Sequence, residues 1–329
     1  MNTSDPCLQA ALPPLVIIAG PTASGKSGLA LAVAEATGGT VINADSAQVY
    51  RDLRIVSARP SAVDEARAPH RLYGTRDGAD PCSAAAWAAD ARAEIERVHA
   101  AGRLPTLVGG TGLYLRTLLQ GIAPIPEIDA DVRATVRAAS VADNYRALLA
   151  EDPAAAAALR PGDSQRVARA LEVLRSTGRT LHAWQACRHG GIHDRVRIAA
   201  RVLTPPRPWL HARCDARFAD ILNGGRPEIE KLLARRLDPD LPVMRAIGVR
   251  ELAGLARGEL SRDDALARGQ AATRAYAKRQ YTWFRNQPPP EWLRCEAPLE
   301  GEETARLAGD LARAAASLQQ MAKVDRLRR

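Results

Sequence analysis

The fold is decided by residues 15–27, which read Leu15-Val-Ile-Ile-Ala-Gly-Pro-Thr-Ala-Ser-Gly-Lys-Ser27. The first five residues form an apolar run that is rich in β-branched side chains, as in a buried parallel strand. The next eight match the pattern G-x-x-x-x-G-K-[ST] at every fixed position. Residues 28–37 then have the composition of a helix, which Gly38-Gly39 would end. We therefore predict a phosphate-binding strand–loop–helix.

The chemistry of this loop follows from its backbone. Successive N–H groups surround phosphate oxygens, and the helix N-terminus adds partial positive charge. We expect Lys26 to contact the terminal phosphate and Ser27 to offer its hydroxyl to a Mg²⁺ ion shared with the phosphates. The residues assigned to phosphate binding are Gly20, Pro21, Thr22, Ala23, Ser24, Gly25, Lys26 and Ser27.

The loop does not by itself indicate ATP hydrolysis. NTPases of this class usually have a second apolar strand that ends in a metal-binding Asp, and this sequence has no clear copy of it. A diphosphate can also be a leaving group, and the same cradle would stabilise its developing charge.

The rest of the chain predicts an α/β fold with an insertion. Strand patterns at 40–43, 104–108 and 196–202 alternate with helices, which favours a parallel sheet flanked by helices, like that of P-loop NTPases. Strand patterns are missing between 124 and 191, where residues 131–140, 144–150, 153–159 and 163–176 are all typical of helices. We expect a catalytic core of residues 10–124 and 191–329 with an inserted all-helical subdomain, 125–190. The core would be completed by helices at 209–222, 227–237, 244–255, 263–286 and 302–324, and by a short edge strand at 292–294.

Charge and cysteine usage restrict the partners. Residues 160–250 contain 18 Lys or Arg against 9 Asp or Glu, whereas residues 1–159 contain 14 against 17. A basic second half suits a polyanion such as nucleic acid, although an arginine-rich composition with solvated faces explains it equally well. The five cysteines are scattered, no run of 18 apolar residues occurs, and the N-terminus lacks the basic residues of a signal peptide. We expect a cytoplasmic protein without a membrane span.

Two polar residues follow predicted strands at the edge where α/β proteins bind ligands. Asp45 comes just after the strand at 40–43, and Thr111 follows the strand at 104–108 within a glycine-rich turn. A carboxylate at this edge could bind Mg²⁺ or accept a proton from a nucleophile. The alternative is that Asp45 only caps a turn and that Thr111 belongs to turn chemistry.

Six segments together resemble one family. In order they are residues 20–27, Asn43-Ala-Asp-Ser-Ala-Gln-Val-Tyr-Arg51, Pro69-His-Arg-Leu72, Leu107-Val-Gly-Gly-Thr-Gly-Leu-Tyr114, Asp163-Ser-Gln-Arg-Val-Ala-Arg-Ala-Leu-Glu172 and Ala277-Lys-Arg-Gln-Tyr-Thr-Trp-Phe-Arg285. This series is similar to the isopentenylpyrophosphate transferase family, the bacterial tRNA dimethylallyltransferases. The resemblance covers about residues 15–294.

The resemblance implies a transfer reaction. A dimethylallyl group would move from dimethylallyl diphosphate to N6 of adenosine-37 in tRNA, immediately 3′ of the anticodon, with release of diphosphate. Lys26 and Ser27 with Mg²⁺ would hold the diphosphate, and Arg217 is a candidate second contact. Asp45 would accept the proton of the adenine amine, while Thr111 would position the base or the diphosphate.

The resemblance also implies an RNA-binding set, and the target base would have to leave the anticodon stack. The set comprises Asp45, Ser46, Ala47, Gln48, Thr111, Arg133, Gln165, Arg166, Val167, Ala168, Arg169, Arg245, Ala246, Ile247, Gly248, Val249, Arg250, Lys278, Arg279, Gln280 and Arg285. Val249 stands where many relatives have an aromatic residue. Helical spacing predicts that Val167, Ala170, Leu171 and Leu174 face the core, which would leave Arg166 and Arg169 free for the RNA backbone. In the helix at 263–286, Tyr276 and Trp283 suit packing.

Three alternatives remain open from the sequence. A small-molecule kinase would use the same loop with Mg²⁺ and ATP. A transferase acting on free adenine nucleotides would share the chemistry, but it would not need the basic insertion. A non-enzymatic RNA-binding protein could use a nucleotide as a switch. We expect a monomer that acts on the anticodon stem-loop.

Overall fold

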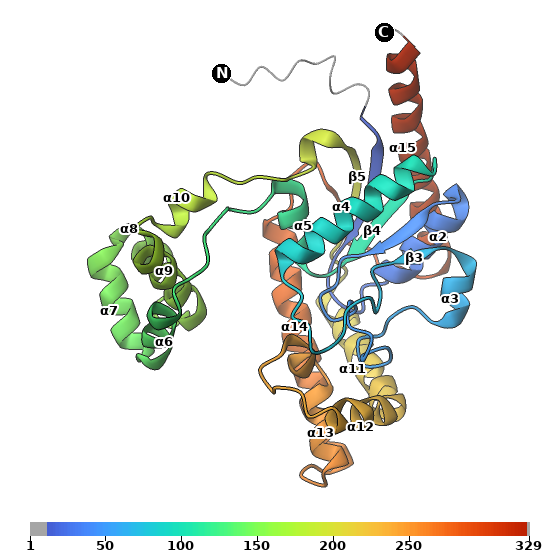
Figure 1. The fold of residues 1–329 in the computed structure, drawn as a ribbon. Coiled ribbons are helices and arrows are strands. Elements are labelled where there is room, and N and C mark those ends of the chain that lie inside the picture. Colours follow the sequence, from blue (N-terminus) through green and yellow to red (C-terminus); the bar gives the residue numbers. More distant parts are fainter. Residues whose placement is uncertain (1–11, 328–329) are drawn as a thin grey trace. The chain divides into compact units, whose positions relative to one another are not determined.

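The computed structural model describes residues 12–327, which include a six-stranded sheet flanked by helices (Figure 1). The strand order is β3-β2-β4-β1-β5-β6, and every neighbouring pair is parallel. The strands are β1 (Pro14–Ala19), β2 (Thr40–Asn43), β3 (His70–Arg71), β4 (Pro105–Gly109), β5 (Arg197–Leu203) and β6 (Leu293–Cys295). The predicted parallel α/β sheet is confirmed, and the short strand near 292–294 does lie at an edge.

Strand β1 is buried on both faces, as its apolar run predicts. Val16 and Ile18 pack in the cluster that contains side chains of α2 (Lys26–Thr37) and α15 (Gly301–Leu327). Leu15 and Ile17 alternate with them and therefore point to the opposite face, which α4 (Ala84–Ala100) covers (Figure 1). This central position fixes the start of the phosphate loop.

A group of helices follows β5. Helices α11 (Arg207–Gly224) and α14 (Arg262–Asn286) pack along one another, and α12 (Arg226–Ala234) and α13 (Val249–Ala256) lie beside them (Figure 1). The prediction of one helix over 244–255 is wrong. A 3₁₀ turn, Pro242–Arg245, precedes α13, and Gly248 between them has φ 96°, a left-handed conformation that ends a helix.

The chain divides into two compact units. Among the described residues, one unit extends up to Leu118 and resumes at Ile192, and the other comprises Leu119–Gly191. The second unit holds only helices among its described elements: α6 (Ala130–Ala138), α7 (Val141–Glu151), α8 (Pro153–Ala158), α9 (Ser164–Thr177) and α10 (Leu181–Gln185). The observed boundaries lie at 118/119 and 191/192, whereas the sequence suggested 124/125 and 190/191.

Helix α9 shows why the insertion folds. Asp163 caps its N-terminus by accepting a hydrogen bond from the Arg166 N–H, and Gly178 ends it at φ 67°. Val167, Ala170 and Leu171 are buried in the core of the unit, as the spacing predicts. Leu174 is only partly buried, and Glu172 takes a buried position instead.

Several short elements are not apparent from the sequence. They are α3 (Ala62–Arg67), α5 (Gly112–Gln120), α10 and the 3₁₀ turn His193–Arg195. Strand β3 has only two residues, too few for a sequence pattern. Within residues 12–327, no helix is long and apolar enough to cross a membrane.

Candidate active site

Three polar segments meet at the carboxyl edge of the sheet. The phosphate loop follows β1, Asp45 follows β2, and Thr111 follows β4. Because β2, β4 and β1 are adjacent and parallel, their carboxyl ends lie side by side. The expected juxtaposition of these three segments is therefore present.

The phosphate loop curls into a concave backbone. Gly25 caps α2 at φ 92°, where an L side chain would be strained, and Lys26 Nζ donates to the Pro21 carbonyl at 2.7 Å. A first cavity of about 410 Å³ opens against the loop. It is lined by Ala23, Ser24, Gly25, Lys26, Ser27 and Gly28 and, from α11, by Arg213, Ala216, Arg217 and Asp220.

A second cavity, of about 280 Å³, contains Asp45. Its lining combines Thr22 of the phosphate loop with Asp45, Ser46, Ala47, Tyr50, Val56, Ser57, Cys82, Arg217, Ile221, Pro242, Arg245, Ala246, Ile247, Thr273, Tyr276 and Arg279. Arg217 lines both cavities. Arg217 therefore stands at the junction between the cavity beside the phosphate loop and the cavity that contains Asp45.

Hydrogen bonds fix the groups around Asp45. Asp45 Oδ1 accepts from the Ala47 N–H at 3.0 Å, so part of its capacity caps the turn. Thr111 Oγ1 accepts from the Ser46 N–H at 2.9 Å and donates to Ser46 Oγ at 3.2 Å. The two segments approach so closely that a Cβ on Gly109 would lie 2.1 Å from the Ala44 carbonyl oxygen. Only glycine allows this contact.

The charges of the site favour an anion. Burial lowers the pKa of Lys26 to about 8, a shift that the nearby Asp45 carboxylate opposes. Burial also lowers the pKa of Arg217, again against the effect of Asp45. Two cations thus share one carboxylate in a poorly hydrated site, so a bound polyanion would relieve their mutual repulsion.

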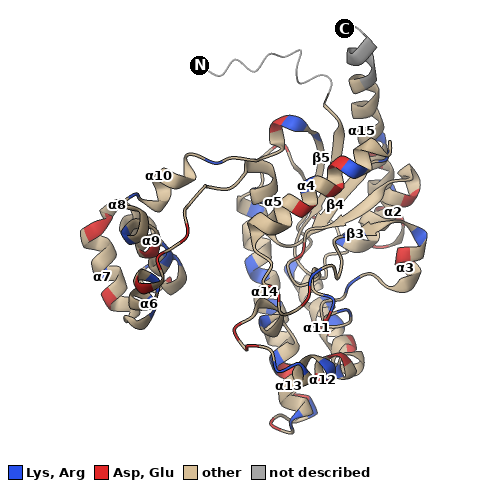
Figure 2. Ribbon diagram, in the orientation of Figure 1, with Lys and Arg blue, Asp and Glu red and all other residues tan. Residues whose placement is uncertain are grey.

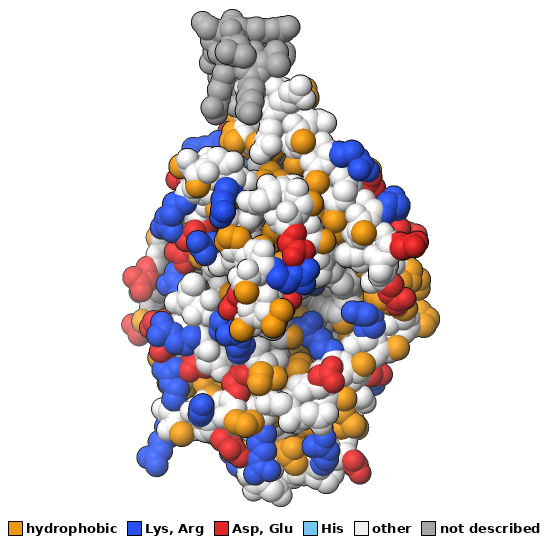
Figure 3. All heavy atoms as spheres, turned by 90° about the vertical axis from the view of Figure 1, so that its right-hand side faces the viewer, with side chains coloured by type: hydrophobic (Ala, Val, Ile, Leu, Met, Phe, Trp, Pro, Cys, Tyr) orange, Lys and Arg blue, Asp and Glu red, His pale blue; other side chains and the backbone are white. Residues whose placement is uncertain are grey.

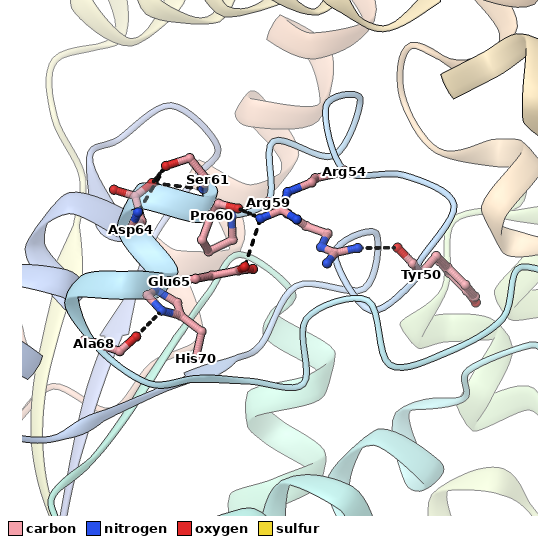
Figure 4. Close-up of polar contacts among 9 residues, drawn as sticks. All are labelled: Tyr50, Arg54, Arg59, Pro60, Ser61, Asp64, Glu65, Ala68 and His70. Atoms are coloured by element: carbon pink, nitrogen blue, oxygen red, sulfur yellow. Dashed lines mark hydrogen bonds and ion pairs between the residues drawn. The ribbon is translucent and has the colours of Figure 1, made fainter. Parts of the chain in front are cut away.

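The wall of the second cavity formed by residues 50–61 is braced from several sides. Arg59 Nη1 donates to the Tyr50 carbonyl at 3.4 Å, and Arg54 Nη2 bonds both the Pro60 carbonyl and Glu65 at 3.0 Å (Figure 4). Gln48 Nε2 donates to the carbonyls of Ser57 and Ala58 at 3.0 and 2.9 Å. Arg217 Nη2 donates to the Ser57 carbonyl at 3.2 Å. The wall that carries Val56 and Ser57 is therefore held in place before any ligand binds.

This geometry has a family counterpart. The model of the IPP transferase family matches residues 48–287. The chain belongs to the IPP transferase family.

Individual relatives agree along nearly the whole chain. It is 61% identical over 282 residues to the tRNA dimethylallyltransferase of Sphingopyxis alaskensis, which covers 85% of this chain and 92% of that protein. The enzyme of the same name from Erythrobacter litoralis is 58% identical over 290 residues, covering 86% and 92%. Among solved structures, the tRNA isopentenylpyrophosphate transferase of Bacillus halodurans superposes with a TM-score of 0.67 at 30% identity, covering 95% of this chain and 99% of that one. A eukaryotic dimethylallyltransferase acting on tRNA gives 0.71 at 27% identity, covering 82% and 69%.

Membership in the IPP transferase family decides between the alternatives left open by the sequence. The small-molecule kinase is not favoured, because the relatives transfer prenyl groups.

The predicted RNA-binding residues of this IPP transferase fall into three groups. The exposed ones are Arg133, Gln165, Arg166, Arg245, Arg250, Lys278, Arg279 and Arg285. Partly buried ones are Asp45, Ser46, Ala47, Gln48, Thr111, Ala168, Arg169, Ala246 and Ile247. The side chains of Val167 and Val249 are 0% and 1% exposed, so an RNA contact through them is contradicted. Gly248 and Gln280 are also buried.

The Lys and Arg side chains of this IPP transferase that could contact RNA include a group on α14. Lys and Arg recur along α14, which carries Lys278, Arg279 and Arg285 (Figure 2). On the face shown in Figure 3, basic and acidic side chains are interspersed. Arg169 lies 3.9 Å from the buried carboxylate of Glu172, and Arg166 lies 3.5 Å from Asp163, so neither arginine is wholly unpartnered.

Two site residues of this IPP transferase were missed by sequence reasoning. Tyr276, which we assigned to packing, lines the second cavity. Burial raises its pKa, so the phenol stays protonated and can donate. Arg213 lines the first cavity and donates to the Ala23 carbonyl at 3.0 Å. A signal for Arg213 was available, because it lies one helical turn before Arg217 on α11.

Proposed function

We propose that this protein transfers the dimethylallyl group of dimethylallyl diphosphate to N6 of the adenosine immediately 3′ of the anticodon in tRNA. A bond forms between the amine nitrogen and the allylic C1 atom while the C1–O bond to the diphosphate breaks. The amine loses one proton, and diphosphate leaves as the second product.

The observation that carries this proposal is the position of Arg217. Its side chain lines both the cavity of the phosphate loop and the cavity of Asp45. A donor whose diphosphate lies in the first cavity would present its allylic carbon at this junction. A base in the second cavity would approach from the other side, which suits displacement of a leaving group.

Each group then has a separate task. The N–H groups of the phosphate loop, Lys26 and Arg217 would stabilise charge that develops on the departing diphosphate. Asp45 would take the proton from the amine. Thr111, which is hydrogen-bonded to Ser46, would orient the base.

The residues present also fit a Mg²⁺ ion that arrives with the diphosphate. Ser27 is exposed in the first cavity beside Lys26, so its hydroxyl can act as a ligand. Residues 12–327 contain no group of three or more His, Cys, Asp or Glu side chains that could hold a metal. The remaining ligands would be phosphate oxygens and water, as is usual for this ion. When bound, Mg²⁺ would neutralise charge on the diphosphate.

Access to the second cavity requires an unstacked base. A duplex or a stacked loop would keep the adenine amine out of such a pocket, so the nucleotide must turn outward. Single-stranded anticodon loops allow this, and exposed arginines can hold their phosphates. We propose that the helical unit Leu119–Gly191 and the exposed face of α14 supply these contacts. We further propose that the enzyme is a cytoplasmic monomer.

The direct test mixes purified protein with dimethylallyl diphosphate, Mg²⁺ and unmodified tRNA in the absence of ATP. We expect tRNA-dependent pyrophosphate release, with prenylated adenosine in the digested RNA. Free adenine nucleotides in place of tRNA should give little product. ATP turnover without tRNA would overturn the proposal.

A further inference from the structure

Gln280 is a buried polar side chain in the middle of α14. Gln280 is only 6% exposed, although its neighbour Arg279 is exposed and its neighbour Tyr281 is only partly buried. Its Oε1 accepts from the Thr22 N–H at 2.7 Å, and its Nε2 donates to the Gly110 carbonyl at 2.8 Å. Both ends of the amide are thus bound to the backbone of the protein.

The two backbone partners belong to the two halves of the site. Thr22 is part of the phosphate loop, and its side chain lines the cavity of Asp45. Gly110 immediately precedes Thr111, which bonds Ser46 next to Asp45. One amide therefore spans the loop that would hold the leaving group and the turn that would orient the base.

The fit around this amide is close and has a single orientation. A Cβ on Gly110 would lie 2.3 Å from Gln280 Nε2, so glycine is required for the approach. An N–H must meet an acceptor and a carbonyl must meet a donor, so the two partners fix which end is oxygen and which is nitrogen. One turn further along α14, Trp283 packs against Gly112, where a Cβ would lie 2.4 Å from the ring.

We propose that Gln280 is a positioning residue for the transfer reaction and not an RNA contact. It fixes the phosphate loop relative to the Thr111 turn, and both to the helix that carries Lys278 and Arg279. The inference rests on the proposed function of the site and adds a residue that acts through Thr22 and Gly110. It predicts that removal of the amide displaces reacting groups while leaving the exposed RNA-binding side chains unchanged.

Two variants test it. Gln280→Ala removes both hydrogen bonds, and Gln280→Glu keeps the shape. Protonated Glu can donate to the Gly110 carbonyl and accept from the Thr22 N–H, whereas ionised Glu cannot donate. The matched control is Gln270→Ala on the same helix, because Gln270 donates to the Asp215 carbonyl at 3.3 Å and is not among the described residues that line either cavity.

We expect Gln280→Ala to lower kcat by about 10- to 100-fold, the effect of misplacing reacting groups. The Kd of this variant for tRNA should be unchanged, and its Kd for inorganic pyrophosphate should be higher than that of the wild type. Gln270→Ala should match the wild type in kcat and in both Kd values. For Gln280→Glu, the ratio of variant to wild-type kcat should rise as the pH falls toward the pKa of the introduced carboxyl, which burial at this position raises above the ordinary value.

The contrary outcomes are distinct. If Gln280→Ala weakens tRNA binding and keeps the wild-type kcat at saturating tRNA, Gln280 is an RNA contact and the inference is wrong. A ratio for Gln280→Glu that does not vary with pH, or equal pyrophosphate affinity in all variants, would also overturn it. If the wild type releases no pyrophosphate from dimethylallyl diphosphate, the proposed function itself fails, whatever the variants do.

Discussion

Lys26, Arg217 and Asp45 form an unbalanced group of charges. A buried cation loses hydration energy, and here two of them share one carboxylate. Backbone carbonyls offset part of this cost, because Lys26 donates to Pro21 in the phosphate loop and Arg217 donates to Ser57 in the wall of the second cavity. A diphosphate would replace these acceptors with full negative charges.

The role of Asp45 as a base leads to the first prediction. Asp45→Asn keeps the size of the side chain and its ability to accept from the Ala47 N–H, but it cannot take the proton. We expect the transfer rate at saturating substrates to fall by about 10²- to 10⁴-fold. The Kd for tRNA should stay the same, which a filter-binding titration can check. Unchanged transfer would exclude Asp45 as the base, and a parallel decrease in tRNA binding would give it a binding role.

The lowered pKa of Lys26 leads to the second prediction. Below about pH 8 the ammonium is charged and attracts diphosphate, and above this value it loses its proton. Pyrophosphate affinity, measured by calorimetry, should therefore fall by about tenfold per pH unit once the pH exceeds the pKa. Lys26→Met gives the baseline, because it retains only the titration of the ligand. Parallel curves for the two proteins would contradict the assignment.

At the scale of elements, α14 links packing and chemistry. Its buried stripe contains Gly269, Thr273, Ala277, Gln280 and Phe284, and the two polar side chains in it serve the site. Polar residues at core spacing were a signal in the sequence, because an apolar helix face does not need them. The family resemblance of the segment 277–285 placed Gln280 in the RNA-binding set together with Lys278 and Arg279.

Helices whose own sequence shows both a hydrophobic spacing and a capping residue were predicted well. The spacing of Val167, Ala170 and Leu171 and the Asp163 cap place α9 to within one residue at each end. Helix α5 was missed because a glycine-rich turn runs directly into it, which hid the apolar stripe of Tyr114, Leu115 and Leu118. The helix predicted over 244–255 is interrupted at Gly248, because this residue has a left-handed backbone conformation that hydrophobic periodicity does not predict.

The cap of α14 gives a prediction about stability alone. Ser261 Oγ accepts from the Asp264 N–H at 3.0 Å and donates to Asp264 Oδ2 at 2.7 Å. Ser261→Ala should lower the free energy of unfolding by about 1 kcal/mol, measured by urea denaturation. Ser261→Thr keeps the hydroxyl and should have a smaller effect. Neither variant should change kcat, since the cap is distant in sequence from Tyr276 and Gln280. A large fall in kcat would show that this end of the helix affects the site.

At the scale of the whole molecule, the six segments that identify the family lie at three places. Those at 20–27, 43–51, 69–72 and 107–114 belong to the sheet and its connections, with 69–72 containing the edge strand β3. The segment at 277–285 contacts them from α14, and the segment at 163–172 lies in the helical unit. The parallel pairing of the strands followed from the alternation of strands and helices in the sequence, whereas the order of the strands is known only from the structure. The shared position of Arg217 between two cavities did not follow from the sequence either, because it depends on how α11 packs against the sheet edge.

The helical unit leads to a prediction about RNA binding. Arg166→Ala and Arg169→Ala should each weaken binding to tRNAs of different sequence by a similar factor. Each should also reduce the slope of log K against log salt concentration by about 1 for every phosphate contact that is lost. Pyrophosphate binding should not change. Arg146→Ala, an exposed arginine on α7 outside the predicted set, is the control. Equal salt slopes in all of these proteins would remove α9 from the RNA interface.

The central claim is tested most directly by mass spectrometry of tRNA nucleosides from a strain that lacks its own tRNA dimethylallyltransferase and carries this gene. We expect the wild-type gene to restore N6-isopentenyladenosine, and the Asp45→Asn form, expressed at the same level, to leave adenosine unmodified. Absence of the isopentenyl mark in cells that express the wild-type protein would contradict the claim.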